Sequence, residues 1–329
     1  MMKRTTIVDV ATAAGVSVAT VSRVLNGGAV RPDTAARVWD AANRLDYTPN
    51  ALTKSIFAGR SSTIGVLIDD LNSPFYLDLM RGIDEVADAN GSLVMFANTF
   101  RHSGREVAQV QTMDEQRVRG LVVTTGESTD ERARKMAARG TPCVVVARSV
   151  EEPAPNLHSV ALDNIAAGRL IAEHLVSCGR RTVGVIISMK RPSQFYRVEG
   201  LRQGLSEAGL PLPEEAVLLV NDNEHVDDAV HGLLERCSSL DAIVCLSGRR
   251  TVAVHSALVA LGLAIPDDIG FLTMDDFAWA PALGVTVIAQ PSYLMGQKAA
   301  ELIIESPPVP EQLTFQPELI ARTSCGEKG

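Results

Sequence analysis

The hydrophobic positions of the first 45 residues recur at helical spacing and are interrupted twice. A first helix is predicted over residues 7–14, with Thr6 as a suitable N-cap. The tripeptide Gly15-Val16-Ser17 breaks the pattern before a second helix predicted over residues 17–25. A proline then opens a third predicted helix over residues 32–45. The chain therefore begins with a small all-α module.

From residue 62 the pattern changes to short, continuously apolar runs that alternate with longer helical stretches. Runs of this kind at 64–68, 93–97, 120–124 and 142–147 are typical of buried strands in a parallel sheet. A helix is predicted over residues 75–90, directly after the first run. This alternation predicts a doubly wound α/β fold.

The strand–helix pattern occurs twice. Ile64-Gly65 resembles Val183-Gly184, 119 residues later, and Gly120-Leu121-Val122-Val123 resembles Ala242-Ile243-Val244-Cys245 at an offset of 122. Nearly constant offsets predict two copies of one α/β lobe. Because ligands bind beyond the carboxyl ends of parallel strands, two facing lobes would form a binding cleft.

The net charge of −8 is distributed unevenly. Residues 1–60 contain eight basic and four acidic side chains, a balance of +4, which leaves −12 for the rest of the chain. A small basic module on an acidic body is the asymmetry expected of a DNA-binding head.

The composition limits the other possibilities. Hydrophobic residues make up 46% and charged residues 21% of the chain, an ordinary globular balance. The five cysteines have no short ligand spacing, so we expect no disulfide, no metal and no cofactor, in a reducing cytoplasm. No apolar run reaches eighteen residues and no signal peptide follows the N-terminus, so neither a membrane segment nor export is expected.

Two alternative classes of protein need to be weighed. The chain has no Gly-x-x-x-x-Gly-Lys phosphate loop, no Gly-x-Ser-x-Gly elbow and only scattered histidines, so we do not expect an enzyme. A solute-binding protein without a transcriptional role would use the same two lobes. The basic head argues against that alternative.

Residues 13–26 have the pattern of a helix-turn-helix. Gly15 permits the positive φ that a steep turn between two helices requires. Several polar side chains on the second helix suit phosphate contacts, namely Ser17, Thr20, Ser22, Arg23 and Asn26. Arg23 is also long enough to reach a guanine edge.

In order and spacing, these residues resemble the LacI/GalR family of transcription factors. The resemblance is carried by residues 6–11, 15–17, 20–26 and 47–50, and then by 64–66, 72–75, 163–164, 179–181 and 275–276. It implies a helix-turn-helix headpiece at 1–49, a hinge segment at 50–61 and an effector-binding and dimerisation domain at 62–329. That domain consists of two doubly wound parallel-sheet lobes of the periplasmic-binding-protein type.

The resemblance also implies how DNA is read. Val18, Ala19 and Arg23 face major-groove base edges, and Arg23 supplies most of the hydrogen-bonded readout. The hinge segment forms a helix in the minor groove, where a side chain wedges into the central base step. The implied DNA-binding residues are Thr6, Ser17, Val18, Ala19, Thr20, Ser22, Arg23, Asn26, Tyr47, Asn50, Lys54 and Ile56.

Two hinge residues depart from the family pattern. Ile56 stands where the family has the wedge leucine, and Thr53 stands where alanine is common. The β-branch of Ile56 makes it stiffer than leucine, which can change the preferred central step. The alternative is that Ile56 is a linker residue packed against its own lobe.

Side chains near the ends of the predicted strands are candidates for effector contact. They are Asn72, Phe75, Thr124, Arg148, Arg197, Ser247 and Asp275. By resemblance, Arg197 and Asp275 match the arginine and aspartate that bind a sugar or purine in the family, since a guanidinium and a carboxylate together fix a polyol. The alternative is that both form ion pairs between the lobes or at the hinge.

Three departures remove acidic or turn residues that are common in the family. Ser247-Gly248 replaces an Asn-Asp pair, Ala147 replaces an aspartate, and Ser188-Met189 replaces a Gly-Pro. Basic residues stand nearby, namely Arg148, Lys190, Arg191, Arg197, Arg249 and Arg250. The hypothesis from these residues is an anionic effector, a sugar acid or sugar phosphate, in place of a neutral sugar.

The implied partners are a pseudo-palindromic double-stranded DNA operator, a small-molecule effector and a second copy of the chain. The mechanism implied is a population shift, in which lobe closure changes the spacing of two heads on adjacent half-sites. The sequence-based prediction is thus an allosteric repressor of a sugar or sugar-derivative operon.

Overall fold

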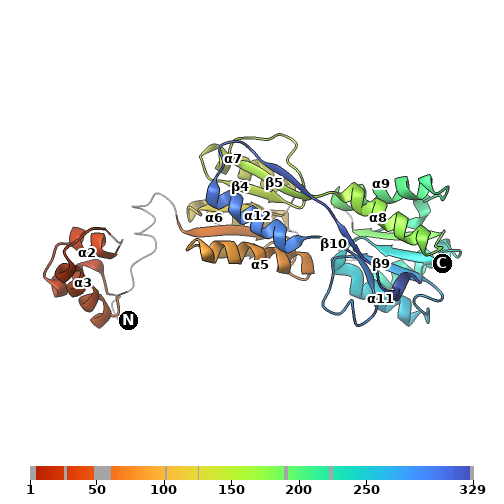
Figure 1. Cartoon of the computed structure of the whole chain (residues 1–329), viewed down its shortest axis with the longest axis horizontal. Helices are drawn as coiled ribbons and strands as arrows, with labels where there is room; N and C mark the ends of the chain where they lie inside the picture. The colour runs from red at the N-terminus through yellow and green to blue at the C-terminus, as the bar shows by residue number, and fades with distance from the viewer. Residues whose placement is uncertain are drawn as a thin grey trace. The chain divides into compact units, whose positions relative to one another are not determined.

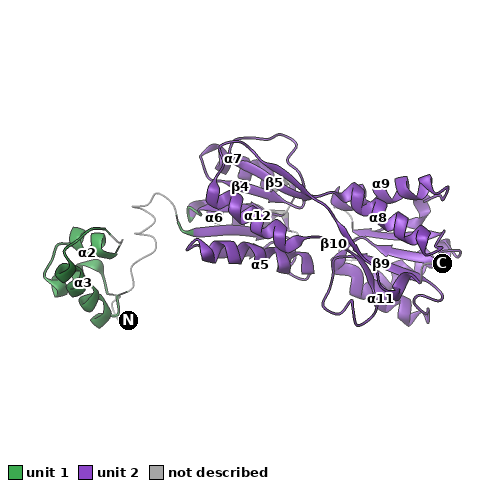
Figure 2. Cartoon of the chain, in the orientation of Figure 1, with its two compact units in different colours: residues 1–62, 116–118 green, residues 63–115, 119–329 purple. Residues whose placement is uncertain are grey.

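The computed structural model divides the chain into two compact units, residues 1–62 with 116–118 and residues 63–115 with 119–329 (Figure 2). The described residues are 5–25, 28–47, 61–100, 102–124, 126–188, 192–221 and 225–326. Asn26 and most of the predicted hinge segment, including Asn50, Lys54 and Ile56, lie outside the described residues.

The smaller unit is a three-helix module made of α1 (Ile7–Ala14), α2 (Val18–Leu25) and α3 (Pro32–Arg44). These helices confirm the predicted elements. Thr6 caps α1 reciprocally with Asp9: the Thr6 backbone N–H donates to Asp9 Oδ2 at 2.8 Å, and the Asp9 N–H donates to Thr6 Oγ1 at 3.4 Å. Gly15 has φ +65°, and α1 and α2 meet there at an angle of 103°.

The head core is formed by apolar side chains from all three helices. Val10, Val21, Val38 and Ala41 are fully buried. These buried side chains hold the second helix against the first and third, and leave its exposed face available to a partner. Among the described residues, no single helix is both long and apolar enough to cross a membrane.

The larger unit contains two six-stranded sheets. The first sheet has the order β11-β5-β4-β3-β1-β2, and its strands are β1 (Thr63–Ile68), β2 (Leu93–Asn98), β3 (Gly120–Val123), β4 (Cys143–Val146), β5 (Leu157–Leu162) and β11 (Gln312–Phe315). The second has the order β12-β10-β9-β8-β6-β7, with β6 (Val183–Ser188), β7 (Val217–Val220), β8 (Ala242–Cys245), β9 (Gly270–Met274), β10 (Thr286–Ala289) and β12 (Glu318–Ile320).

Helices cover both sheets and define two lobes. The first lobe carries α5 (Pro74–Ala89), α6 (Ser103–Glu115), α7 (Glu127–Ala138) and α12 (Ser292–Glu305). The second lobe carries α8 (Asn164–Ser177), α9 (Pro192–Glu207), α10 (Val226–Arg236) and α11 (Thr251–Ala260), with the short helices η1 (Glu214–Ala216), η2 (Gly248–Arg250) and η3 (Thr323–Cys325). The two lobes confirm the predicted doubly wound fold.

The internal repeat extends to the backbone. The two sheets have the same strand order, so that β1 to β5 and β11 of the first correspond to β6 to β10 and β12 of the second. Gly140 and Gly262, which match in the sequence repeat, both have positive φ, of +89° and +78°. The predicted parallel sheets are confirmed, and the second sheet carries one antiparallel strand at its edge. The edge strand β12 runs antiparallel to β10, with Val287 opposite Ile320, since the chain returns along an edge that has no crossover helix of its own.

Each lobe takes one helix from the other half of the repeat. Helix α8 follows β5 of the first sheet but packs against α9, whereas α12 follows β10 of the second sheet but packs against α5 (Figure 1). The chain therefore passes between the lobes at about residues 163, 290 and 316. These three crossovers lie close to the strand ends at which a ligand is expected.

Glycines allow the exchanged helices to approach closely. A Cβ added at Gly168 of α8 would overlap the carbonyl oxygen of Arg197, and one at Gly200 of α9 would overlap that of Ile165. In the first lobe, Gly82 of α5 and Gly296 of α12 face each other in the same way. The absence of side chains at these crossings lets helix backbones touch.

We predict that Gly168→Ala destabilises the larger unit by about 2 kcal/mol, because the methyl group forces α8 away from α9. Urea unfolding followed by circular dichroism measures the change. Gly104→Ala is the matched control, since a Cβ at Gly104 of α6 meets nothing within 4 Å. Equal stability of the two variants would contradict this account of the crossing.

Candidate nucleic-acid interface and effector cleft

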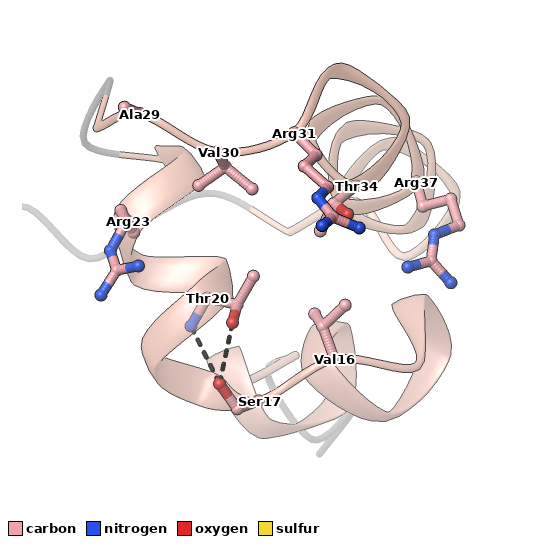
Figure 3. Close-up of a pocket in the computed structure, with 9 residues that line it drawn as sticks. All are labelled: Val16, Ser17, Thr20, Arg23, Ala29, Val30, Arg31, Thr34 and Arg37. Atoms are coloured by element: carbon pink, nitrogen blue, oxygen red, sulfur yellow. Dashed lines mark hydrogen bonds between the residues drawn. The ribbon is translucent and has the colours of Figure 1, made fainter.

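A basic groove lies on the head, between the start of α2 and the start of α3 (Figure 3). It is lined by Val16, Ser17, Thr20, Arg23, Ala29, Val30, Arg31, Thr34 and Arg37. Three guanidinium groups and three hydroxyl groups line it, with no carboxylate among these nine residues. Such a lining suits the phosphate backbone of a nucleic acid.

The α2 terminus is organised by Ser17. Its Oγ accepts the Thr20 backbone N–H at 3.1 Å and lies 2.9 Å from Thr20 Oγ1, as the dashed lines in Figure 3 mark. This is the predicted N-cap, and it orients both hydroxyl groups at the groove. Val18, Ala19 and Arg23 are exposed on the same helix, whereas Ser22 is half-buried.

Two other predicted head residues support the fold. Thr6 is occupied by the α1 cap, where its hydroxyl also donates to Asp9 at 2.7 Å. Tyr47 is half-buried, and its ring packs against the head core. Their hydroxyl groups lie outside the groove-lining set.

Sequence reasoning missed the contribution of α3. Arg31, Thr34 and Arg37 line the groove opposite Ser17 and Thr20, and Figure 3 shows Arg23 and Arg37 at opposite ends of it. The available signal was the spacing, since residues 31, 34 and 37 fall on one face of a helix that begins at a proline. From the sequence, Arg31 and Arg37 had contributed only to the net positive charge of residues 1–60.

A second site lies between the two lobes of the larger unit. From the first lobe it is lined by Asp69, Ser73, Phe75, Tyr76 and Ala147. From the second lobe and the second crossover it is lined by Ser193, Gln194, Arg197, Leu246, Ser247, Gly248, Arg249, Asp275 and Gln290. We call this the effector cleft. It lies at the carboxyl ends of the strands in both sheets, as the fold predicts.

Arg197 is the most constrained polar residue of the cleft. Its guanidinium is buried and donates to Asn164 Oδ1 at 2.8 Å, to the Leu246 carbonyl at 3.2 Å and to Gln290 Oε1 at 3.3 Å. Burial lowers its pKa to about 10, and the charge of Asp275 acts in the opposite direction. At neutral pH the side chain therefore remains a cation.

Asp275 is joined to Arg197 through Gln290. The amide of Gln290 donates to Asp275 Oδ1 at 2.6 Å, so one side chain bridges the cation and the carboxylate. Burial raises the pKa of Asp275, while Arg197 and the Gln290 hydrogen bond lower it. The pair can orient a polar ligand and also contacts the crossover residues Asn164 and Gln290, so its role in binding an effector stays a prediction.

The backbone at the strand ends is strained on both sides of the cleft. Ala147 after β4 and Asp275 after β9 occupy equivalent places in the two sheets, and their φ values are +71° and +70°. Non-glycine residues in this region concentrate at binding sites. The internal repeat thus aims one strand-end residue of each lobe into the cleft.

The Ser247-Gly248 departure has a direct effect on Asp275. A Cβ added at Gly248 would overlap Asp275 Oδ2, so glycine is needed for the carboxylate to occupy this position. Ser247 lies beside it, and its Oγ accepts the Ser188 hydroxyl at 3.3 Å. Glycine at position 248 therefore leaves room for the carboxylate of Asp275, which the sequence predicted as an effector contact.

Three predicted effector residues lie outside the lining set. Asn72 donates its side-chain amide to Asp70 Oδ1 at 2.9 Å, and buried Thr124 donates to the Leu67 carbonyl at 3.1 Å. Arg148 forms an ion pair with Asp130 of α7, within the first lobe. The other four, Phe75, Arg197, Ser247 and Asp275, line the cleft.

The cleft also contains residues that sequence reasoning did not select, among them Asp69, Tyr76, Gln194 and Gln290. Phe75 and Tyr76 stack edge to face at 5.1 Å between ring centroids. Gln194 Oε1 accepts the Ser188 backbone N–H at 2.7 Å. Gln290 lies at a crossover, where no periodic pattern marks it, so only the fold brings it to the site.

The charges of the described lining are balanced. Arg197 and Arg249 stand against Asp69 and Asp275. Arg250 is buried within the second lobe, where it donates to Ser188 Oγ at 3.0 Å and to the Asn221 carbonyl at 2.6 Å. Lys190 and Arg191 lie outside the described residues, so the described part of the cleft gives no preference for an anion.

Comparison with known proteins agrees with this architecture. Residues 6–50 match the family described as "Bacterial regulatory proteins, lacI family", and residues 61–323 match "Periplasmic binding proteins and sugar binding domain of LacI family". The Ribose operon repressor of Halalkalibacterium halodurans is 32% identical over 92% of this chain and 90% of its own. The HTH-type transcriptional regulator DegA of Bacillus subtilis is 29% identical over 98% of both chains.

Solved structures show the same fold. The lac repressor dimer bound to operator and the anti-inducer ONPF has a TM-score of 0.84 at 22% identity, covering 99% of this chain and 100% of that one. The CelR–cellobiose complex has a TM-score of 0.71 at 26% identity, covering 98% of this chain and 100% of that one.

A helix-turn-helix head joined to a two-lobed ligand-binding domain defines an effector-controlled transcription regulator. The chain belongs to the LacI family of bacterial regulatory proteins. It is a DNA-binding regulator and not an enzyme, and the family match excludes a solute-binding protein without a transcriptional role.

We predict that Arg37→Gln weakens binding to a random-sequence duplex and lowers the slope of log K against log salt by about 0.9, the value for one lost phosphate contact. Fluorescence anisotropy over a salt series measures the slope. Arg44→Gln is the control. It removes the same charge from α3, but Arg44 lies outside the groove and pairs with Asp40. The same loss of slope in both variants would show only a general charge effect.

Proposed function

We propose that this protein represses genes for the use of a sugar or sugar derivative, and that a small molecule in the effector cleft controls its affinity for an operator. Relatives named as regulators of the ribose operon and as GalS support this role. The observation that carries the proposal is the Arg197–Gln290–Asp275 network, because the side chains positioned to hold a ligand also hold the crossovers.

The proposed division of labour on DNA follows the head groove. Val18, Ala19 and Arg23 read base edges, while Ser17, Thr20, Arg31 and Arg37 contact phosphates. Further phosphate contacts come from Thr6, Ser22, Tyr47 and Asn26, and the minor-groove contacts come from Asn50, Lys54 and Ile56. The last four of these proposals rest on the sequence alone, because their residues lie outside the described ranges.

We propose that the protein acts as a homodimer in the cytoplasm on a pseudo-palindromic operator. The dimer named in the lac repressor structure supports this assembly. Large apolar side chains are available for it on the larger unit. On the β2 edge of the first lobe, Leu93 and Phe96 are 73% and 51% exposed, and Val252 and Val259 are exposed on α11 of the second lobe.

The effector we propose is a polyhydroxylated small molecule. Paired guanidinium and carboxylate groups bind vicinal hydroxyl groups, and the Phe75–Tyr76 pair offers an apolar face to a sugar ring. Arg148, Asn72 and Thr124 act behind this lining. The anionic effector suggested by the sequence stays a prediction that depends on Lys190 and Arg191.

The first experiment is selection of bound duplexes from a random DNA library with the full-length protein, followed by sequencing. We expect an inverted repeat with two half-sites, whose recovery falls in an Arg23→Ala variant. Enrichment of an asymmetric single site, or of none above background, would contradict a dimeric operator-binding regulator.

The second experiment is a thermal-shift screen against neutral sugars, sugar acids and sugar phosphates. A ligand at 100 times its Kd stabilises the folded state by about 2.7 kcal/mol, so we expect a melting-temperature rise of several degrees for at least one class. Neutral hits alone would remove the anionic hypothesis. No shift with any class would contradict a sugar-type effector.

Two variants connect a hit to the cleft. Asp275→Asn and Gly248→Ala are expected to reduce the ligand-induced shift by more than half, because the second displaces the carboxylate that the first neutralises. Thr124→Ser keeps the buried hydroxyl behind the lining and is expected to retain the full shift. An undiminished shift in Gly248→Ala would place the effector elsewhere.

A further inference from the structure

An ion pair crosses the effector cleft at a point separate from the chain crossovers. Arg249 of η2, in the second lobe, places Nε 3.4 Å from Oδ2 of Asp70, which follows β1 in the first lobe. The two side chains are 26% and 8% exposed. Helix η2 also packs against α5 of the first lobe. The lobes are therefore joined on the cleft side as well as through the backbone.

Asp70 is held ready for this contact by its own loop. Its Oδ1 accepts the backbone N–H of Asn72 at 3.0 Å and the Asn72 side-chain amide at 2.9 Å. Because these two hydrogen bonds fix the carboxylate, Oδ2 faces Arg249 with little rotamer freedom left to lose. Asn72, which the sequence suggested as an effector contact, thus orients the first-lobe half of the pair.

Arg249 is fixed from its two sides. Gly248 before it has no side chain, so the loop approaches Asp275 closely. Arg250 after it is anchored inside the second lobe by Ser188 Oγ and the Asn221 carbonyl. With both neighbours fixed, the Arg249 side chain is directed across the cleft, where it also forms part of the lining.

We infer that Arg249 and Asp70 form a latch that favours the closed cleft before any effector binds. The inference rests on the proposed effector role of the cleft. The partners belong to different lobes, so opening the cleft separates them and returns both charges to water. The latch therefore sets the population of the binding-competent closed form, and with it the amount of effector that the regulator needs.

The test is hydrogen–deuterium exchange of the full-length protein without ligand, read by mass spectrometry in segments 69–76 and 246–251. Arg249→Met removes the charge and keeps the stem, and Asp70→Asn keeps the acceptor for Asn72. Each variant is expected to speed exchange in both segments by roughly two- to fivefold, the range for a partly exposed ion pair. The double variant is expected to match the single ones, because the pair can be lost only once.

Three controls separate a latch from local loosening. Arg249→Lys keeps the charge and is expected to restore most of the protection. Arg169→Gln breaks the Arg169–Glu207 pair inside the second lobe, at 2.6 Å, and is expected to leave cleft exchange unchanged. Raising the salt concentration is expected to speed cleft exchange in the native protein but not in Arg249→Met.

Unchanged cleft exchange in Arg249→Met, or additive effects in the double variant, would overturn the latch. The ligand-induced thermal shift of the native protein is measured in parallel. The absence of a shift with every class of sugar would count against the proposed effector role of the cleft, whereas the exchange result concerns the ion pair alone, so the two failures are distinguishable.

Discussion

Burying the Arg197 guanidinium is the constraint around which the larger unit is arranged. An ionised side chain in the interior requires acceptors for its N–H groups, and here they come from Asn164, the Leu246 carbonyl and Gln290. Two of these acceptors lie where the chain passes between lobes. Any ligand that draws on Arg197 or Asp275 therefore competes with, or reinforces, the contacts that set the lobe arrangement.

A second link ties the remaining crossover to the first. The amide of Gln316 donates to Asp163 Oδ2 at 3.5 Å, while Asp163 Oδ1 caps α8 by accepting the Ala166 N–H at 2.9 Å. All three passages between the lobes are thus connected by side-chain hydrogen bonds. Relative lobe motion has to alter these hydrogen bonds together, which suits a transition between two discrete arrangements.

Much of the head could be predicted because its signals are local. Thr6, Gly15 and Ser17 act on the next few residues, so caps and turn followed from the sequence. The lobes were predictable from the repeat. The antiparallel β12 and the exchange of α8 and α12 were not, because they depend on which distant surface is left uncovered once the other elements have packed.

The effector cleft was predictable only in part. Arg197 and Asp275 carry a chemistry that marks them, and the structure brings them together through Gln290. Arg148 has the same guanidinium group as Arg197, but it forms an ion pair with Asp130 of α7 and does not line the cleft. The sequence gives the type and position of a side chain. Which partner it binds depends on the neighbours that the fold brings near it, and these follow only from the three-dimensional structure.

The exchange of helices has a consequence for the order in which the protein matures on the ribosome. The first lobe is built from residues 63–162 but needs α12 and β11, which are synthesised only after residue 292. The second lobe likewise receives its edge strand β12 only after α12 and β11 have been synthesised. Head folding depends on none of these, so a nascent chain carries a finished DNA-binding module well before either lobe is complete. In a regulator built in this way, the module that contacts DNA is complete before the lobes that pair and control it.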